Sequence, residues 1–109
     1  MVTCPSVSIV LPVFNERESI PILLDEIHGA LSSTYDYEIV CVDDGSNDGT
    51  FEYLRERSRS DNKIKLIQFL RNYGKSAALA EGFRHVDSEY VVTLDSDLQD
   101  DPLEIHKMV

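Results

Sequence analysis

The sequence has no tryptophan, only two cysteines, few basic residues and no long apolar run. Cys4 and Cys41 lack the spacing of a zinc site or a disulfide framework, so we expect free thiols in a reducing compartment, with Cys41 buried. Ten Lys and Arg stand against twenty Asp and Glu, a formal net charge of -10, which argues against a nucleic-acid backbone or an anionic membrane as the main partner. The longest apolar run, residues 7–14, is interrupted by Pro12 and is too short to span a bilayer.

Strand-like and helix-like segments alternate along the 109 residues. The apolar patterns predict strands at residues 7–11, 37–42, 64–69 and 90–94, with Pro12 ending the first, and helices that begin near Ser19, after residue 50, at Lys75 and at Pro102. The second helix has a thin apolar stripe, and residues 55–61 are expected to be its solvated end and linker. Connections of this length predict an α/β fold with a doubly wound, mainly parallel sheet, as a single domain over residues 1–109.

Three predicted loops follow the carboxyl ends of strands, at residues 12–16, 43–46 and 95–99. In a parallel sheet these loops open on one edge, where α/β folds bind their ligands. Asp95 and Asp97 flank a single residue at the end of an apolar strand. Two carboxylates so near to one another repel unless a cation or another partner is present. A divalent cation that bridges them to a phosphate is therefore plausible.

Two common phosphate-binding motifs are absent. Gly74-Lys75-Ser76 resembles the end of a P-loop, but the spacing requires glycine at position 69, which is Phe69. Residues 12–16 stand where a dinucleotide-binding fold has its glycine-rich turn. The sequence therefore gives little support to a P-loop nucleotidase or to a nicotinamide- or flavin-dependent enzyme.

Four motifs in order resemble the family 2 glycosyltransferases of the GT-A fold. They are residues 11–16 (LPVFNE), 42–50 (VDDGSNDGT), 71–75 (RNYGK) and 95–100 (DSDLQD). Within that family the sequence looks most like the polyisoprenyl-phosphate sugar transferases, the group that contains dolichol-phosphate mannosyltransferase and the undecaprenyl-phosphate glycosyltransferases. Members of the family continue well beyond the last motif, so the resemblance implies the donor-binding N-terminal half of a longer enzyme.

The resemblance also implies roles for individual residues. Asp95 and Asp97 match the D-x-D pair and are the expected catalytic residues, and with Gln99 they would hold Mg2+ or Mn2+. The expected nucleotide-binding residues are Pro12, Val13, Phe14, Glu16, Val42, Asp44, Asp95 and Ser96. The donor would be a GDP- or UDP-linked sugar, and the acceptor a polyisoprenyl phosphate that the missing half binds. This reading implies a location in the cytoplasm, or at the cytoplasmic face of a membrane for the full-length protein.

Other interpretations remain open from the sequence. The chain could be a metal- or nucleotide-binding fragment without turnover, or a receiver-like domain that binds Mg2+ in an acidic pocket. A receiver places its acid pair after the first strand, whereas Asp43 and Asp44 follow the second. These acids, with Ser46 and Asp48, could also merely shape the turn and cap the second helix. Surfaces left uncovered by a missing half could pair two chains as a homodimer.

Overall fold

The computed structural model describes residues 6–94, in which strands and helices alternate strictly. The elements are β1 (Ser6–Val13), α1 (Ile20–Leu31), β2 (Asp36–Asp44), α2 (Thr50–Ser60), β3 (Ile64–Phe69), α3 (Lys75–Phe83) and β4 (Tyr90–Thr93). The predicted α/β class is confirmed. The helix predicted from Pro102 lies outside the described residues.

All strand pairs in the described part of the chain are parallel, and the strand order is β3-β2-β1-β4. The chain moves outward from β1 through β2 to β3 and then returns to place β4 on the other side of β1. The carboxyl ends of β1 and β4 thus flank a topological switch point, the position at which doubly wound folds bind ligands. A receiver domain has the order 2-1-3-4-5, so the present order does not support the receiver interpretation.

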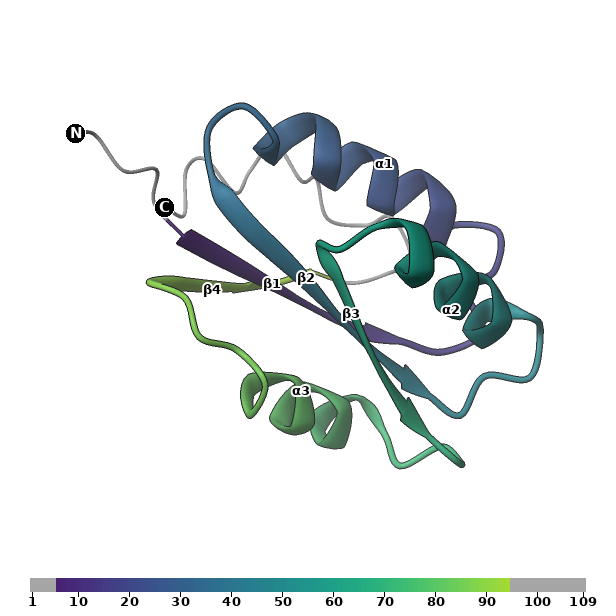
Figure 1. The fold of residues 1–109 in the computed structure, drawn as a ribbon. Coiled ribbons are helices and arrows are strands. Elements are labelled where there is room, and N and C mark those ends of the chain that lie inside the picture. The colour runs from purple at the N-terminus through teal and green to yellow at the C-terminus, as the bar shows by residue number, and fades with distance from the viewer. Residues whose placement is uncertain (1–5, 95–109) are drawn as a thin grey trace.

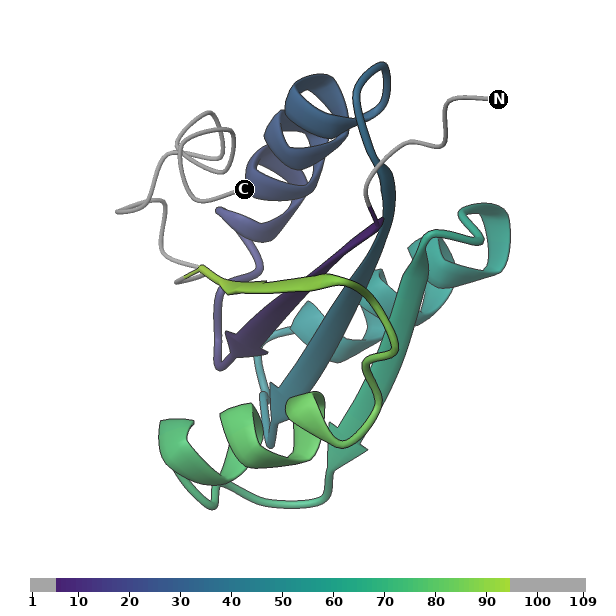
Figure 2. The same ribbon diagram turned by 90° about the vertical axis from the view of Figure 1, so that its left-hand side faces the viewer.

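The helices cover both faces of the sheet, as Figure 1 shows, with α1 and α2 on one side and α3 on the other. The turned view in Figure 2 shows the same layers. Alternate strand residues enter the two cores. The larger core, under α1 and α2, contains Val7, Ile9, Leu11, Ile39, Cys41, Leu23, Leu24, Ile27 and Leu54 among others. The smaller core, under α3, is built on Val10, Val40, Val42 and Ala78.

The small residues of α3 allow this helix to lie close to the sheet. A β-carbon added to Gly82 would lie 2.4 Å from Cγ1 of Val10, well inside van der Waals contact. Gly82 is buried and Ala78 is fully buried. The sequence from Lys75 to Val86, rich in alanine and glycine, predicts a helix over that range that packs closely on the sheet. The close packing is present, although α3 ends at Phe83.

Pro12 does not end the first strand, which corrects the sequence prediction. β1 continues to Val13, and Pro12 pairs in register with Val42 of β2. The carbonyl of Val10 faces β4, where it accepts a hydrogen bond from the Leu94 amide at 3.3 Å, so the nitrogen of Pro12 faces the same side. The β1–β4 pairing stops at Val10 and Thr93, and the ladder with β4 therefore loses no donor at Pro12.

The second helix is longer than predicted, because long-range contacts bind its charged half. Nη2 of Arg57 lies 2.8 Å from Oδ1 of Asp25 in α1, and Nη1 donates a hydrogen bond to the Tyr53 hydroxyl at 2.9 Å. Residues 55–60 form the mostly exposed, charged end of α2, as predicted, but the helix includes all of them, and the linker begins only at Asp61. The predicted start of α1 is confirmed, since Ser19 is its N-cap and Pro21 lies in its first turn.

Candidate functional site

The loops that follow β1 and β2 are tied together by backbone-to-side-chain hydrogen bonds. The amide of Asn15 donates to Oγ of Ser46 at 2.9 Å, and the amide of Asn47 donates to Oδ1 of Asn15 at 2.8 Å. Asn15 adopts a positive φ of 51°, a conformation that asparagine tolerates better than most residues. This reciprocal pair fixes the position of the loop after β1 at the carboxyl edge of the sheet.

A second pair of contacts joins the same two loops closer to α2. The amide of Glu16 donates to Oγ1 of Thr50 at 3.1 Å, and the amide of Arg17 donates to Oδ2 of Asp48 at 3.3 Å. Asp48 also accepts hydrogen bonds from the amide and the hydroxyl of Thr50. These bonds lower the pKa of Asp48 despite the opposing effect of desolvation. The turn-shaping role that we considered for Asp48 is therefore present.

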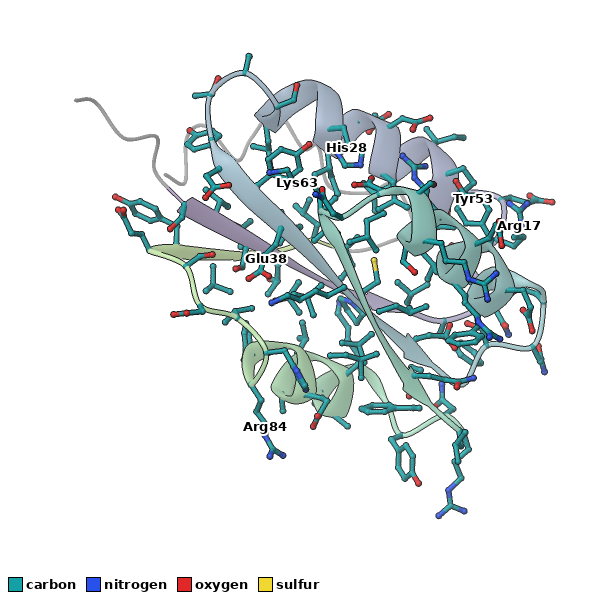
Figure 3. All side chains as sticks on the ribbon, in the orientation of Figure 1. Arg17, His28, Glu38, Tyr53, Lys63 and Arg84 are labelled. Atoms are coloured by element: carbon teal, nitrogen blue, oxygen red, sulfur yellow. The ribbon has the colours of Figure 1, made fainter. Side chains whose placement is uncertain are left out.

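Arg17 extends this junction toward α2. Its guanidinium carbon lies 4.4 Å from the centroid of the Tyr53 ring, as a cation–π contact. Figure 3 shows the two side chains together, away from His28 and Lys63. Arg17 is exposed, so this contact lies at the surface of the molecule, beside the loops that follow β1 and β2.

Asp44, at the last position of β2, joins the loop after β3 to the sheet. Its Oδ1 accepts a hydrogen bond from the amide of Tyr73 at 2.7 Å, and its Oδ2 accepts one from the amide of Gly74 at 3.0 Å. The Asp44 carbonyl accepts a further bond from Nδ2 of Asn72 at 3.3 Å. Asp44 therefore does not cap α2. Each carboxylate oxygen has more than one acceptor direction, so the side chain retains capacity to accept from a ligand.

Gly45 permits this close approach of the two loops. It has a φ of 78°, and a β-carbon at this position would lie 2.4 Å from the carbonyl carbon of Arg71 and 2.6 Å from the amide nitrogen of Asn72. Both atoms belong to the backbone and cannot rotate away. Only glycine fits here, for steric and conformational reasons together.

Asp43 is buried with one carboxylate oxygen unsatisfied. The residue is 1 % exposed; its Oδ2 accepts a hydrogen bond from the amide of Ser46 at 3.2 Å, and its Oδ1 has no partner among the described residues. Burial raises the pKa of Asp43, the nearby carboxylates of Glu52 and Asp44 raise it further, and the bonds from Ser46 oppose the shift. Asp43 thus shapes the turn after β2, as the alternative interpretation proposed.

The residues expected to bind a nucleotide differ in accessibility. Val13 and Val42 are fully buried and present no surface at this edge. Phe14 is 43 % exposed, while Pro12 and Glu16 are partly exposed. Glu16 accepts a hydrogen bond from Oγ of Ser19 at 2.8 Å, next to the start of α1.

The residues expected to bind the metal cannot be placed. Asp95, Ser96, Asp97 and Gln99 lie outside the described residues, directly after β4 in the sequence. Within residues 6–94 no group of three or more His, Cys, Asp or Glu side chains could hold a metal ion. No helix in the same range is both long enough and apolar enough to cross a membrane.

Several residues that organise the edge were not among the predicted site residues. Asn15, Thr50 and the amides of Tyr73 and Gly74 make the bonds that hold the three loops. The polar, glycine-rich loop composition indicated turns but not partners. The sequence did contain one indication that Asn15 shapes this turn. Asn15 comes soon after a strand and is one of the few non-glycine residues that accept a positive φ.

The sequence matches the family model for glycosyl transferase family 2 over residues 8–109. The chain belongs to this family. This membership confirms the family that the four sequence motifs predicted. The match begins in β1 and spans all four strands.

Known proteins agree with this assignment. The chain is 45% identical over 105 residues to an undecaprenyl-phosphate 4-deoxy-4-formamido-L-arabinose transferase of Yersinia pestis, and the alignment covers 94% of the chain and 32% of that protein. The fold is similar to the mannosyltransferase PcManGT of Pyrobaculum calidifontis, solved in complex with GDP-Man and Mn2+, with a TM-score of 0.76, 31% identity, and 86% of this chain and 28% of that chain covered. It is also similar to S. aureus TarS 1-349 in complex with UDP-GlcNAc, with a TM-score of 0.74 and 25% identity. That alignment covers 94% of this chain and 29% of the TarS chain. The chain spans about a third of the length of the curated relatives it matches.

Proposed function

We propose that this chain forms the donor-binding part of a glycosyltransferase that transfers a sugar from a GDP- or UDP-linked donor to a polyisoprenyl phosphate. The observation that carries the proposal is the carboxyl edge of the sheet. There the switch point between β1 and β4 adjoins loops held by Asn15, Asp44 and Thr50. A nucleotide placed at this edge would have Phe14 and Pro12 on one side and the Asp44 carboxylate on another.

The proposed reaction requires stabilisation of the leaving group above all. An oxygen of the acceptor phosphate attacks the anomeric carbon of the sugar, the bond from that carbon to the diphosphate oxygen breaks, and the nucleoside diphosphate leaves with the electron pair. Because the acceptor phosphate is already an anion, the attack needs little help from a general base. Asp44 and the loop after β1 would bind and orient the nucleotide, so that the reacting carbon is held in place.

Asp95, Asp97 and Gln99 would hold a Mg2+ or Mn2+ ion, and Ser96 would lie beside the nucleotide. Carboxylate and amide oxygens are the ligands that these hard cations prefer, so the donor set fits. When bound, the ion would neutralise the charge that develops on the departing diphosphate. The relation to PcManGT, whose structure contains GDP-Man and Mn2+, supports this assignment. The names of the relatives, which specify undecaprenyl phosphate, support the choice of acceptor.

The test is isothermal titration calorimetry of the folded chain with GDP and UDP, each with Mg2+, with Mn2+ and with EDTA. We expect binding that depends on the metal and that is weakened by Asp97→Ala. Asp101→Ala is the matched control, because it removes an acid from the same stretch to which no role is assigned. Equal affinities for wild type and Asp97→Ala would refute the metal assignment, and the absence of any nucleotide binding would count against the donor site. Product assays with a polyprenyl phosphate and each nucleotide sugar distinguish an enzyme from a binding fragment.

A further inference from the structure

The charges of this acidic chain are unevenly distributed. Residues 62–80, which contain β3, the loop after it and most of α3, include four of the ten basic residues and none of the twenty acidic ones. Lys63 and Lys65, at the start of this stretch, pair with Asp36 and Glu38 of β2 at 3.6 and 2.7 Å. The guanidinium of Arg71, in contrast, interacts with Tyr73 and has no carboxylate partner among the described residues. Within residues 6–94, the loop after β3 therefore carries a positive charge at Arg71 that no carboxylate compensates.

The same loop exposes apolar and aromatic side chains. Leu70 is 89 % exposed, the highest value among the large hydrophobic residues described, and Tyr73 is 57 % exposed. The guanidinium carbon of Arg71 lies 5.2 Å from the centroid of the Tyr73 ring, and Nε of Arg71 donates a hydrogen bond to the Tyr73 hydroxyl at 3.2 Å. The connection from β3 to α3 runs along the bottom of the molecule in Figure 2. It thus presents a leucine, an aromatic ring and a cation together to solvent.

The loop is held in this exposed position by the sheet. Asp44 binds the amides of Tyr73 and Gly74, and Gly45 lies directly against the backbone of Arg71. Phe69 packs edge-on against the Tyr73 ring, with the centroids 5.4 Å apart. Little conformational freedom remains to be lost when the loop binds a surface, which favours binding.

We propose that the loop formed by residues 70–75 docks on the surface of a bilayer that contains anionic phospholipids. Leu70 and the ring of Tyr73 would enter the interfacial region, while Arg71 would face the lipid phosphates, the usual arrangement of apolar, aromatic and basic residues at membrane interfaces. The loop lies at the carboxyl edge of the sheet, so this docking brings the edge to the membrane. That consequence rests on the proposed function, because a lipid-linked acceptor presents its phosphate at the same surface.

The net charge of -10 does not prevent such docking. Exposed charges farther apart than about 10 Å are largely screened at 0.1 M ionic strength, so the membrane senses the nearest charges most strongly. The net charge argues against an anionic membrane as the main partner of the whole chain. It leaves room for a local contact through a loop without acidic residues, and it predicts weak, reversible binding.

The experiment is co-sedimentation of the chain with vesicles, without nucleotide or metal. One set is made of phosphatidylcholine alone and the other of phosphatidylcholine with phosphatidylglycerol. We expect binding to the second set, weakened by salt, and a partition coefficient reduced by at least about tenfold in Leu70→Ser/Arg71→Gln. The matched control is Phe83→Ser/Arg84→Gln, which removes an adjacent apolar and basic pair at the end of α3, where Phe83 is 47 % exposed and Arg84 pairs with Glu81 at 3.6 Å. Circular dichroism of both variants establishes that they fold.

Each outcome decides the proposal. Loss of binding in the loop variant but not in the control supports it. Equal binding to both vesicle sets, no binding to either, or equal loss in both variants overturns it. Titration of the loop variant with GDP and UDP separates this result from the proposed function. A variant that binds nucleotide normally but not vesicles leaves the donor site intact, whereas one that loses only nucleotide binding would show that the loop contacts the donor instead of lipid.

Discussion

Replacing Asp44 by alanine should destabilise the chain strongly, because the carboxylate holds two loops together. The substitution leaves the amides of Tyr73 and Gly74 without the acceptors that they reach at 2.7 and 3.0 Å. An unsatisfied buried donor costs about 1–3 kcal/mol, and hydrogen bonds to charged groups lie at the upper end of the range. Because water can reach the exposed Tyr73 in part, we expect a total loss of about 2–4 kcal/mol.

Urea denaturation followed by circular dichroism measures this loss as a lower midpoint at an unchanged slope. Asp36→Ala is the control. It removes an exposed acid of the same strand whose ion pair with Lys63 spans 3.6 Å, and such surface pairs contribute about 0–1 kcal/mol. If Asp44→Ala were as stable as Asp36→Ala, the carboxylate would not hold the loop after β3, and the geometry assigned to this edge would be wrong.

Three further predictions concern the interior and the turn. Gly45→Ala should lower the free energy of unfolding by at least about 2 kcal/mol, because Gly45 has a positive φ and the added β-carbon would lie 2.4 Å from a backbone atom. Gly29→Ala in α1 is the control. No atom lies within 4 Å of the carbon added there, so this variant should be neutral or stabilising in the same urea assay. Asp43→Asn should remove a pH dependence of stability. Because burial raises the folded-state pKa of Asp43 above the ordinary value of 3.8, this carboxyl group loses its proton at lower pH in the unfolded chain than in the folded one, and wild-type stability should fall relative to the variant as pH rises from 3.8 through the folded pKa. Thermal melts at several pH values would show or refute this trend. Burial raises the pKa of the Cys41 thiol to about 12. In a Cys4→Ser background, Cys41 should therefore react with iodoacetamide only as fast as the chain unfolds. Rapid labelling of the native state would contradict its buried position.

The fold was predictable because its signals are local. Runs such as residues 7–11 and 37–42 are rich in β-branched residues, and the apolar residues of α1 recur at helical spacing, so each element could be recognised within a short window. Even the start of α1 at Ser19 followed from Pro21. The parallel arrangement then followed from the alternation of strands and helices.

The errors arose where distant contacts decide the structure. Pro12 reads as a strand end, but it remains within β1 because β4 does not extend far enough to need its amide. Residues 55–61 were expected to be a solvated helix end that passes into a linker, but the helix continues to Ser60, where Arg57 binds Asp25, which lies 32 residues earlier. The partners of Asp44 are 29 and 30 residues away, and no local pattern identifies them. The turn residues were recognised as turn formers, but their pairing across loops required the structure.

The most direct measurement of the central claim is anomalous diffraction from crystals of the chain grown with Mn2+ and GDP or UDP. The proposal predicts a manganese peak at the carboxyl edge of the sheet, at the switch point between β1 and β4, coordinated by Asp97 and by the diphosphate. A bound nucleotide without manganese beside its diphosphate, or a manganese peak at any other part of the molecule, would contradict it.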